Sequence, residues 1–266
     1  LAAALSRRAG PEADAMRVSL SRIIVTKDGG ASLARDTSHR RPHKVREQSD
    51  YEVFEGFLRS AESVAEWLSA QRTGESDVRR CDARRVPRRY FESADLVVTS
   101  PPYLNAIDYL RGHRMSLVWL GFSIPRLRTI RRASVGSEAQ NPAVANHPGL
   151  LAVIEDEVAR LPPRERGLLE RFSLDLRVSA RCVARCLKPG GGQVTVIGDS
   201  TIRGTFVRNS ELAKEAGRRA GLQLASETVR ESPDSRRYLP PPRSDSSTLS
   251  KRMRTEVVLE FVKPST

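Results

Sequence analysis

A short apolar segment that ends at two consecutive prolines constrains the fold of this 266-residue chain more than any other feature. Residues 94–99 read Ala-Asp-Leu-Val-Val-Thr, and Ser100-Pro101-Pro102 follow directly. The β-branched residues favour a buried strand, whereas proline cannot donate the backbone hydrogen bond that would continue it. The sequence therefore predicts a buried strand over 94–99 with a stiff turn at its carboxyl end.

Strands and helices are expected to alternate around this segment, which predicts an α/β domain with a mostly parallel sheet. Apolar residues at helical spacing over 51–71 predict an amphipathic helix that faces the core. Further helices are expected over residues 109–120, 150–161, 164–187 and 211–220, and further strands over residues 22–26, 77–81, 193–197, 222–229 and 255–262. No helix separates the last two strands, so we expect an antiparallel pair at one edge of the sheet.

The length suits a single domain over residues 1–266, because it is short for two. Two polar segments interrupt the expected domain. Residues 123–148 are a polar, basic insertion, and residues 232–250 are a loop rich in proline and serine.

Charge and composition narrow the classes of partner. Lysine and arginine total 45 against 32 acidic residues, and this net charge of +13 favours a polyanion such as nucleic acid, with a solvated basic surface as the alternative. No apolar run approaches the roughly 20 residues that span a bilayer, so no membrane partner is expected. Three sparse cysteines do not suggest a disulfide framework, which favours a reducing, cytoplasmic location.

The turn after residue 99 has the groups that methylation of an amino group on a nucleic-acid base requires. Ligands in open α/β sheets bind beyond the carboxyl ends of strands, where this turn lies. The Ser100 hydroxyl and the Pro101 carbonyl can accept the two amino protons, and Pro102 stiffens the turn. Tyr103 is expected to expose its ring and to stack on a base that has been turned out of its helix.

The tract Asp95–Tyr103 resembles the catalytic motif of the amino methyltransferases of DNA, which produce N4-methylcytosine or N6-methyladenine. A serine before the two prolines is more similar to the cytosine-N4 branch. Similarity to this family continues in the tract up to Gly121 and in the turn Leu187-Lys188-Pro189-Gly190-Gly191 with the strand after it. Residues 237–240 and 252–256 are similar to the family's C-terminal hairpin region. The resemblance covers most of residues 20–262.

The resemblance implies a Rossmann-like class I methyltransferase fold, S-adenosyl-L-methionine as the cofactor, and double-stranded DNA with a flipped base as the substrate. It implies a site-specific enzyme, solitary or paired with a restriction enzyme. The catalytic residues would be Ser100, Pro101, Pro102 and Tyr103. The cofactor would contact Asp82, Ala83 and Thr99, and the DNA would contact Arg111. The basic cluster of Arg126, Arg128, Arg131 and Arg132 predicts a further DNA-facing surface, with a solvated basic helix end as the alternative.

The family's glycine-rich cofactor loop is not recognisable in this chain. Gly190-Gly191-Gly192 precedes an expected strand instead of following one, so it does not have the order of that loop. We therefore expect a sheet that lacks the family's first two strands, with the missing strands upstream, and weak cofactor binding by this segment alone.

Several alternatives stay open. An RNA amino methyltransferase shares a Pro-Pro-Tyr loop on the same fold, and a catalytically inactive remnant would only bind nucleic acid or a partner. Asp82 could instead be an exposed residue that begins a turn, and Cys182 and Cys186 are favoured as structural positions over metal ligands, since no metal site is expected. No Pro-Cys dipeptide is present, which argues against C5-cytosine methylation through a thiolate.

Overall fold

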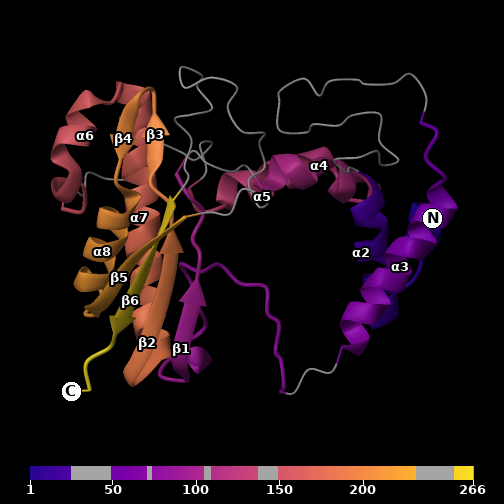
Figure 1. The fold of residues 1–266 in the computed structure, drawn as a ribbon, viewed down its shortest axis with the longest axis horizontal. Coiled ribbons are helices and arrows are strands. Elements are labelled where there is room, and N and C mark those ends of the chain that lie inside the picture. Colours follow the sequence, from indigo (N-terminus) through magenta and orange to yellow (C-terminus); the bar gives the residue numbers. More distant parts are fainter. Residues whose placement is uncertain (25–48, 71–73, 105–108, 137–148, 232–254, 266) are drawn as a thin grey trace. The chain divides into compact units, whose positions relative to one another are not determined.

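The computed structural model describes residues 1–24, 49–70, 74–104, 109–136, 149–231 and 255–265. The chain divides into two compact units (Figure 1). The first unit comprises Leu1–Val78 and Asp108–Arg131, and the second comprises Arg79–Ile107 and Arg132–Thr266. The single domain expected over 1–266 stays a prediction. Within the expected polar insertion over 123–148, Ile124–Ala133 form a helix, which the sequence did not anticipate. Residues 137–148 and the whole of 232–250 lie outside the described residues.

Helices make up the regular structure in the described part of the first unit. They are α1 (Ala2–Ser6), α2 (Pro11–Ile24), α3 (Val53–Ser69), α4 (Tyr109–Trp119) and most of α5 (Ile124–Ala133). The strand expected over residues 22–26 is wrong for residues 22–24, which form the last turn of α2. Leu20, Ile23 and Ile24 recur at helical spacing and are buried with Leu5, so packing overrides the local β propensity.

The helix expected over 51–71 is confirmed as α3, but the face that it buries differs from the expected one. Its buried residues are Gly56, Ser60 and Val64, spaced four apart, whereas Phe54 and Leu58 are exposed. The Ser60 hydroxyl donates to a backbone carbonyl of α2 at 3.0 Å. Small residues on this face allow α2 and α3 to approach closely, which the larger apolar residues would prevent.

The second unit contains a four-stranded sheet with the strand order β1-β2-β6-β5 (Figure 1). These strands are β1 (Ala94–Thr99), β2 (Leu187–Ile197), β5 (Gln223–Glu231) and β6 (Thr255–Val262). β1 and β2 are parallel, while β6 is antiparallel to both β2 and β5. The α/β class and the antiparallel edge pair are therefore confirmed. A small hairpin of β3 (Ser200–Ile202) and β4 (Thr205–Val207) was not anticipated.

Helices α7 (Pro163–Cys186) and α8 (Asn209–Arg219) cover one face of this sheet (Figure 1). Val257, Leu259 and Phe261 of β6 point into the resulting core, where Phe172 of α7 is fully buried. The shorter elements of the unit are η1 (Arg88–Tyr90), η2 (Leu151–Ile154) and α6 (Glu155–Arg160), the last two in place of the helix expected over 150–161.

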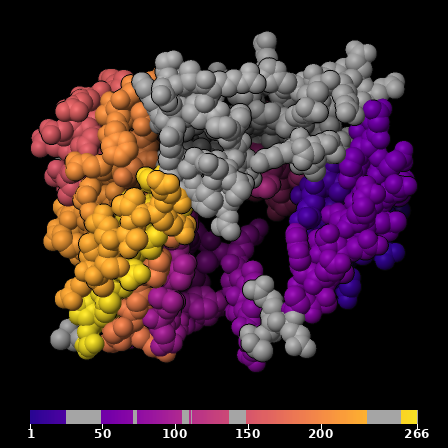
Figure 2. All heavy atoms as spheres, in the orientation of Figure 1, coloured from indigo at the N-terminus to yellow at the C-terminus, as the bar shows by residue number. Residues whose placement is uncertain are grey.

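Two expectations about strands need correction. Residues 77–81 form no strand, because no described strand lies beside them to complete a hydrogen-bond ladder. β1 is only half-buried, since Leu96 and Val98 are 58% and 69% exposed on the face opposite α7 and α8. Side chains of β5 and β6 likewise lie at the surface of the second unit in Figure 2.

The Lys-Pro-Gly-Gly segment brings the start of β2 against the start of β1. A Cβ atom on Gly191 would lie 2.9 Å from the Lys188 carbonyl oxygen and 3.2 Å from that of Asp95. Gly190 has a φ of +77°, a conformation that L-residues rarely adopt. The Lys188 ammonium also pairs with Asp95 at 2.7 Å. Glycine is therefore required for this close crossing, which sets the parallel register of the two strands.

Candidate active site at the carboxyl end of β1

The predicted turn occupies the position that the sequence indicates. Ser100, Pro101 and Pro102 follow β1 directly, with Ser100 exposed and both prolines half-buried. Thr99 pairs with Thr195 of the parallel strand β2, so the carboxyl ends of both strands meet at this edge. Groups that project beyond such an edge are well placed to bind a ligand.

Tyr103 is buried, contrary to the expectation of an exposed aromatic ring. The residue is 9% exposed and belongs to the main core of the second unit. Its hydroxyl donates to Glu256 Oε1 of β6 at 2.8 Å and lies 3.3 Å from the Ser100 hydroxyl. A ring face packed in the core does not present a stacking surface, so in this conformation only the hydroxyl of Tyr103 is directed toward the turn.

Glu256 is held in place from the neighbouring strand. Arg230 of β5 lies opposite Glu256 in the antiparallel register and donates to Glu256 Oε2 through Nε at 3.0 Å and through a terminal nitrogen at 2.7 Å. The side chain of Glu256 is 17% exposed and that of Arg230 is 55% exposed. Sequence reasoning placed Glu256 only within a region of family resemblance, because no local pattern predicts its contact with a residue 153 positions earlier.

A second buried group anchors the end of the turn. The Ser200 hydroxyl donates to the Leu104 carbonyl at 2.6 Å and accepts from the Asn209 amide at 2.8 Å. Asn209 is completely buried and also donates to the Gly198 carbonyl at 2.9 Å. Asp199 accepts from the backbone N–H of Ser210 at 2.9 Å, near the start of α8. Sequence reasoning included Leu104 in the tract of family resemblance and the end of the strand before Ser200, but it gave no role to Ser200 or Asn209.

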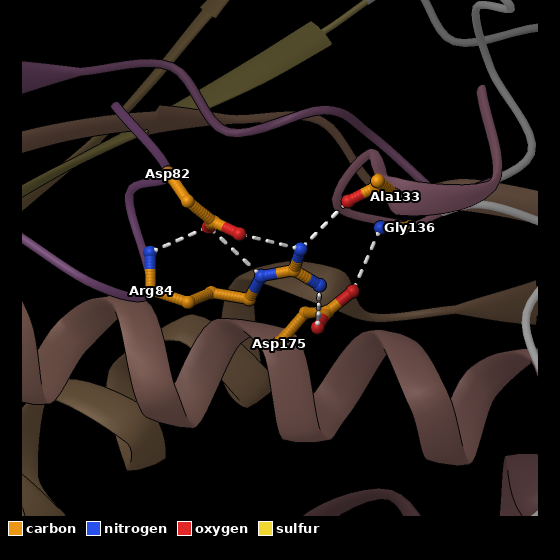
Figure 3. Close-up of polar contacts among 5 residues, drawn as sticks. All are labelled: Asp82, Arg84, Ala133, Gly136 and Asp175. Atoms are coloured by element: carbon orange, nitrogen blue, oxygen red, sulfur yellow. Dashed lines mark hydrogen bonds and ion pairs between the residues drawn. The ribbon is translucent and has the colours of Figure 1, made fainter. Parts of the chain in front are cut away.

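Asp82 begins a turn and is engaged by Arg84 (Figure 3). Its carboxylate accepts from the Arg84 backbone N–H at 2.9 Å and from the Arg84 guanidinium at 3.0 and 2.8 Å. The hydrogen bonds from the Arg84 side chain hold the pKa of Asp82 below its ordinary value. This geometry agrees with the turn alternative, and Ala83 beside it is exposed.

Arg84 also ties this turn to α7 (Figure 3). Its guanidinium donates to Asp175 at 2.8 Å and to the Ala133 carbonyl at 2.6 Å. Asp175, whose side chain is 10% exposed, accepts a further bond from the Gly136 N–H at 3.0 Å. The Arg84 cluster, defined here as Asp82, Arg84, Ala133, Gly136 and Asp175, therefore joins three chain segments of the second unit.

The predicted DNA-contacting arginines fall mainly in the first unit. Arg126 and Arg128 are exposed on α5, where the Arg126 guanidinium lies 4.6 Å from the centre of the Phe122 ring. Arg131 is half-buried at the end of that unit, and Arg132 is exposed as the first residue of the next segment of the second unit. Arg111 lies in α4, and its side chain is outside the described part of the structure.

The remaining candidates are structural. Cys182 and Cys186 are buried in α7, where burial raises the pKa of the Cys186 thiol. No group of three or more metal-binding side chains occurs among the described residues. None of the helices in the described ranges combines the length and apolar character needed to cross a bilayer. A hollow beside α8, lined in part by Glu211, Lys214 and Phe261, contains none of the residues of the candidate turn.

Comparison with known proteins gives one sequence match and several weak structural ones. No family model matches the chain. A segment of 56 residues is 34% identical to the type II methyltransferase M.BsoBI of Geobacillus stearothermophilus, and it represents 21% of this chain but only 11% of that protein. The chain therefore matches about one tenth of the length of that curated relative.

The solved structures include three of TTHA0409, a candidate DNA modification methylase of Thermus thermophilus. The sequence identities are 18% to 20%, and the match covers 70% of this chain and 51% to 53% of the other. One of these structures is a complex with S-adenosyl-L-methionine. Their TM-scores of 0.34 and 0.35 do not establish a common overall fold. The comparisons therefore show similarity to a type II methyltransferase over one 56-residue segment of the chain.

Proposed function

We propose that this chain carries the catalytic turn of an S-adenosyl-L-methionine-dependent methyltransferase that modifies an exocyclic amino group of a DNA base. The observation that carries this proposal is the exposed Ser100, followed by two prolines, at the carboxyl end of a parallel strand. The similarity of a 56-residue segment to a type II methyltransferase supports it. Cytosine N4 is the proposed target atom, because Ser100 precedes the prolines.

The roles of the turn follow from the chemistry of an aromatic amine. Its nitrogen lone pair is delocalised into the ring, so the amine is a weak nucleophile. Acceptors at the Ser100 hydroxyl and the Pro101 carbonyl would hold the two N–H groups and favour a tetrahedral nitrogen. Pro102 limits the motion of the turn, so that the acceptors are oriented before the base arrives. Tyr103 contributes through its hydroxyl, since its ring is packed in the core.

The residues proposed to contact the cofactor have suitable chemistry. S-adenosyl-L-methionine, when bound, supplies an electrophilic methyl group. Thr99 is half-buried beside the turn, and Ala83 is exposed. Asp82 retains a side-chain exposure of 37%. Each of its oxygens has two acceptor positions, so it could accept from an adenine amino group while it remains bonded to Arg84.

The proposed nucleic-acid partner is double-stranded DNA with the target base turned out of the helix. A base inside a duplex cannot place its amino group beside Ser100, so extrusion is required. The net charge of +13 and the exposed Arg126 and Arg128 on α5 suit phosphate contacts. Site specificity, and pairing with a restriction enzyme, are part of the same proposal.

Mass spectrometry of nucleosides tests the proposal directly. The full-length protein that contains this chain is purified and incubated with S-adenosyl-L-methionine and with methyl-free genomic DNA or unmodified transfer RNA, and each nucleic acid is then digested. We expect N4-methylcytosine from the DNA. N6-methyladenine would change the target atom, whereas methylation of the RNA alone would contradict a DNA substrate.

Matched serine variants test the assigned turn. Ser100→Ala should lower the rate by about tenfold or more, because one acceptor for the amino group is lost. Ser93→Ala is the control, since Ser93 is exposed at the other end of β1 and its hydroxyl donates to the nearby Tyr90 carbonyl at 2.7 Å. A Ser100→Ala rate equal to that of Ser93→Ala would remove Ser100 from the mechanism.

A further inference from the structure

We propose that Glu256 is a positioning residue that fixes the Ser100 hydroxyl, through Tyr103, as a hydrogen-bond acceptor toward the substrate. This inference rests on the proposed function. The inference extends that function to residues of β5 and β6. It also gives a reason why the site would select a ring amino group over a ring carbonyl.

The direction of each hydrogen bond follows from the number of protons available. A carboxylate can only accept, so the 2.8 Å contact between Tyr103 and Glu256 uses the single hydroxyl proton of Tyr103. The Ser100 and Tyr103 hydroxyls lie 3.3 Å apart, and the distance alone permits either to donate. Because the Tyr103 proton is committed to Glu256, Ser100 must be the donor in this pair.

This arrangement determines what Ser100 can offer to a substrate. The Ser100 hydroxyl directs its only proton at Tyr103, so toward solvent or a substrate it can only accept a hydrogen bond. A ring amino group would find a partner there. A ring carbonyl at the same position, as in thymine or uracil, would face oxygen lone pairs without a donor between them. An unmade buried hydrogen bond is costly, so the site would discriminate against the carbonyl.

Arg230 determines which oxygen of Glu256 remains for Tyr103. Its guanidinium has donors only, and two of its nitrogens contact Oε2. Oε1 therefore stays available to the Tyr103 hydroxyl. The more exposed Arg230 and the more buried Glu256 lie opposite each other in neighbouring strands, so the backbone register maintains the pair.

Glu256→Gln separates this positioning role from simple packing. Glutamine has the same shape, but it has one acceptor oxygen and one donor NH2 group. If its oxygen faces Arg230, its NH2 faces the Tyr103 hydroxyl, which must then donate to Ser100 and reverse the polarity. If its oxygen faces Tyr103, its NH2 opposes the guanidinium.

Removing Arg230 should therefore restore function to the glutamine variant. In Glu256→Gln combined with Arg230→Leu, the glutamine oxygen is free to accept from Tyr103. Arg230→Leu alone removes a group that orients Glu256 but leaves a carboxylate to accept from Tyr103, so its kcat should stay above that of Glu256→Gln. A merely structural role predicts that kcat falls and recovers only in step with the melting temperature of each variant.

The experiment measures kcat and KM for methyl transfer to methyl-free DNA by the full-length protein that contains this chain. We expect Glu256→Gln to lower kcat about tenfold or more, with KM for S-adenosyl-L-methionine unchanged, and the double variant to recover most of that loss. Glu260→Gln is the control, because Glu260 is an exposed glutamate of the same strand.

The outcomes distinguish this inference from the function on which it rests. No methylated nucleoside from the unsubstituted protein overturns both. Methylation by that protein, with either an unchanged kcat in Glu256→Gln or no recovery in the double variant, overturns the role of Glu256 alone. Thermal unfolding of each variant is measured as well, and kcat values that merely follow the melting temperatures would overturn the positioning role.

Discussion

Arg84→Met is expected to destabilise the second unit by about 3 kcal/mol. The substitution keeps most of the apolar stem of Arg84 but leaves Asp175 with the Gly136 N–H as its remaining partner in the Arg84 cluster. Breaking a buried ion pair from one side costs roughly 3–5 kcal/mol, and the Gly136 bond places this case at the lower end. The more exposed contact with Asp82 adds about 0–1 kcal/mol.

Urea unfolding followed by circular dichroism measures this loss. With a slope of about 2 kcal/mol per molar urea, a change of 3 kcal/mol moves the midpoint down by about 1.5 M. Arg181→Met is the matched control, because Arg181 is an exposed arginine of α7, and a surface change of this kind usually stays within about 0.5 kcal/mol.

The double variant Arg84→Met with Asp175→Leu tests the assigned cause. Replacing both partners removes the isolated carboxylate, so its loss should be well below the sum of the two single losses. A shift of the Arg84→Met midpoint below about 0.5 M, or additive losses in the double variant, would show that solvent already satisfies Asp175. The cost assigned to its burial would then be refuted.

Three further predictions concern the packing, charge and anchoring of the same unit. Gly217→Ala should cost about 1–3 kcal/mol, because its Cβ would lie 2.6 Å from the buried ring of Phe261; an unchanged urea midpoint would show that the ring moves aside. The hydrogen bond from Arg218 lowers the pKa of Glu215 to about 2, so its contribution to stability is complete above pH 4.5 and is lost as the pH falls toward 2. The melting temperatures of wild type and Glu215→Gln should therefore converge in acid, and a constant difference would contradict the assignment. Ser200→Ala should cost about 1–2 kcal/mol and increase proteolysis within the candidate turn, because a 2.6 Å bond to that segment is lost; equal cleavage rates would show that the bond does not restrain it.

Local patterns predicted the elements whose signal is contained within a short segment. The strand 255–262 and the helices near 109–120, 164–187 and 211–220 agree with the structure because their apolar spacing and their glycine or proline ends coincide. The turn after residue 99 was likewise predictable, since a proline pair ends a strand whatever surrounds it.

The errors occurred where a distant part of the chain decides the outcome. Residues 77–81 read as a strand, but a strand requires a neighbour. The face of α3 that is buried depends on its fit to α2, which favours Gly56, Ser60 and Val64 over larger residues. The predicted roles of Asp82, Ala83 and Thr99 with the cofactor, and of the arginines with DNA, stay predictions.

The sequence by itself determined the α/β character of the chain and the chemistry of the Ser-Pro-Pro corner, because both depend on the conformational limits of neighbouring residues. Only the tertiary structure decided that Tyr103 is buried and that its hydroxyl contacts Glu256, which Arg230 holds from the adjacent strand. A local sequence pattern cannot decide these contacts, because the direction of a hydrogen bond depends on which group lies opposite the hydroxyl in the folded chain. Tyr103 and Glu256 lie 153 residues apart in the chain, and the folding of the sheet brings them together.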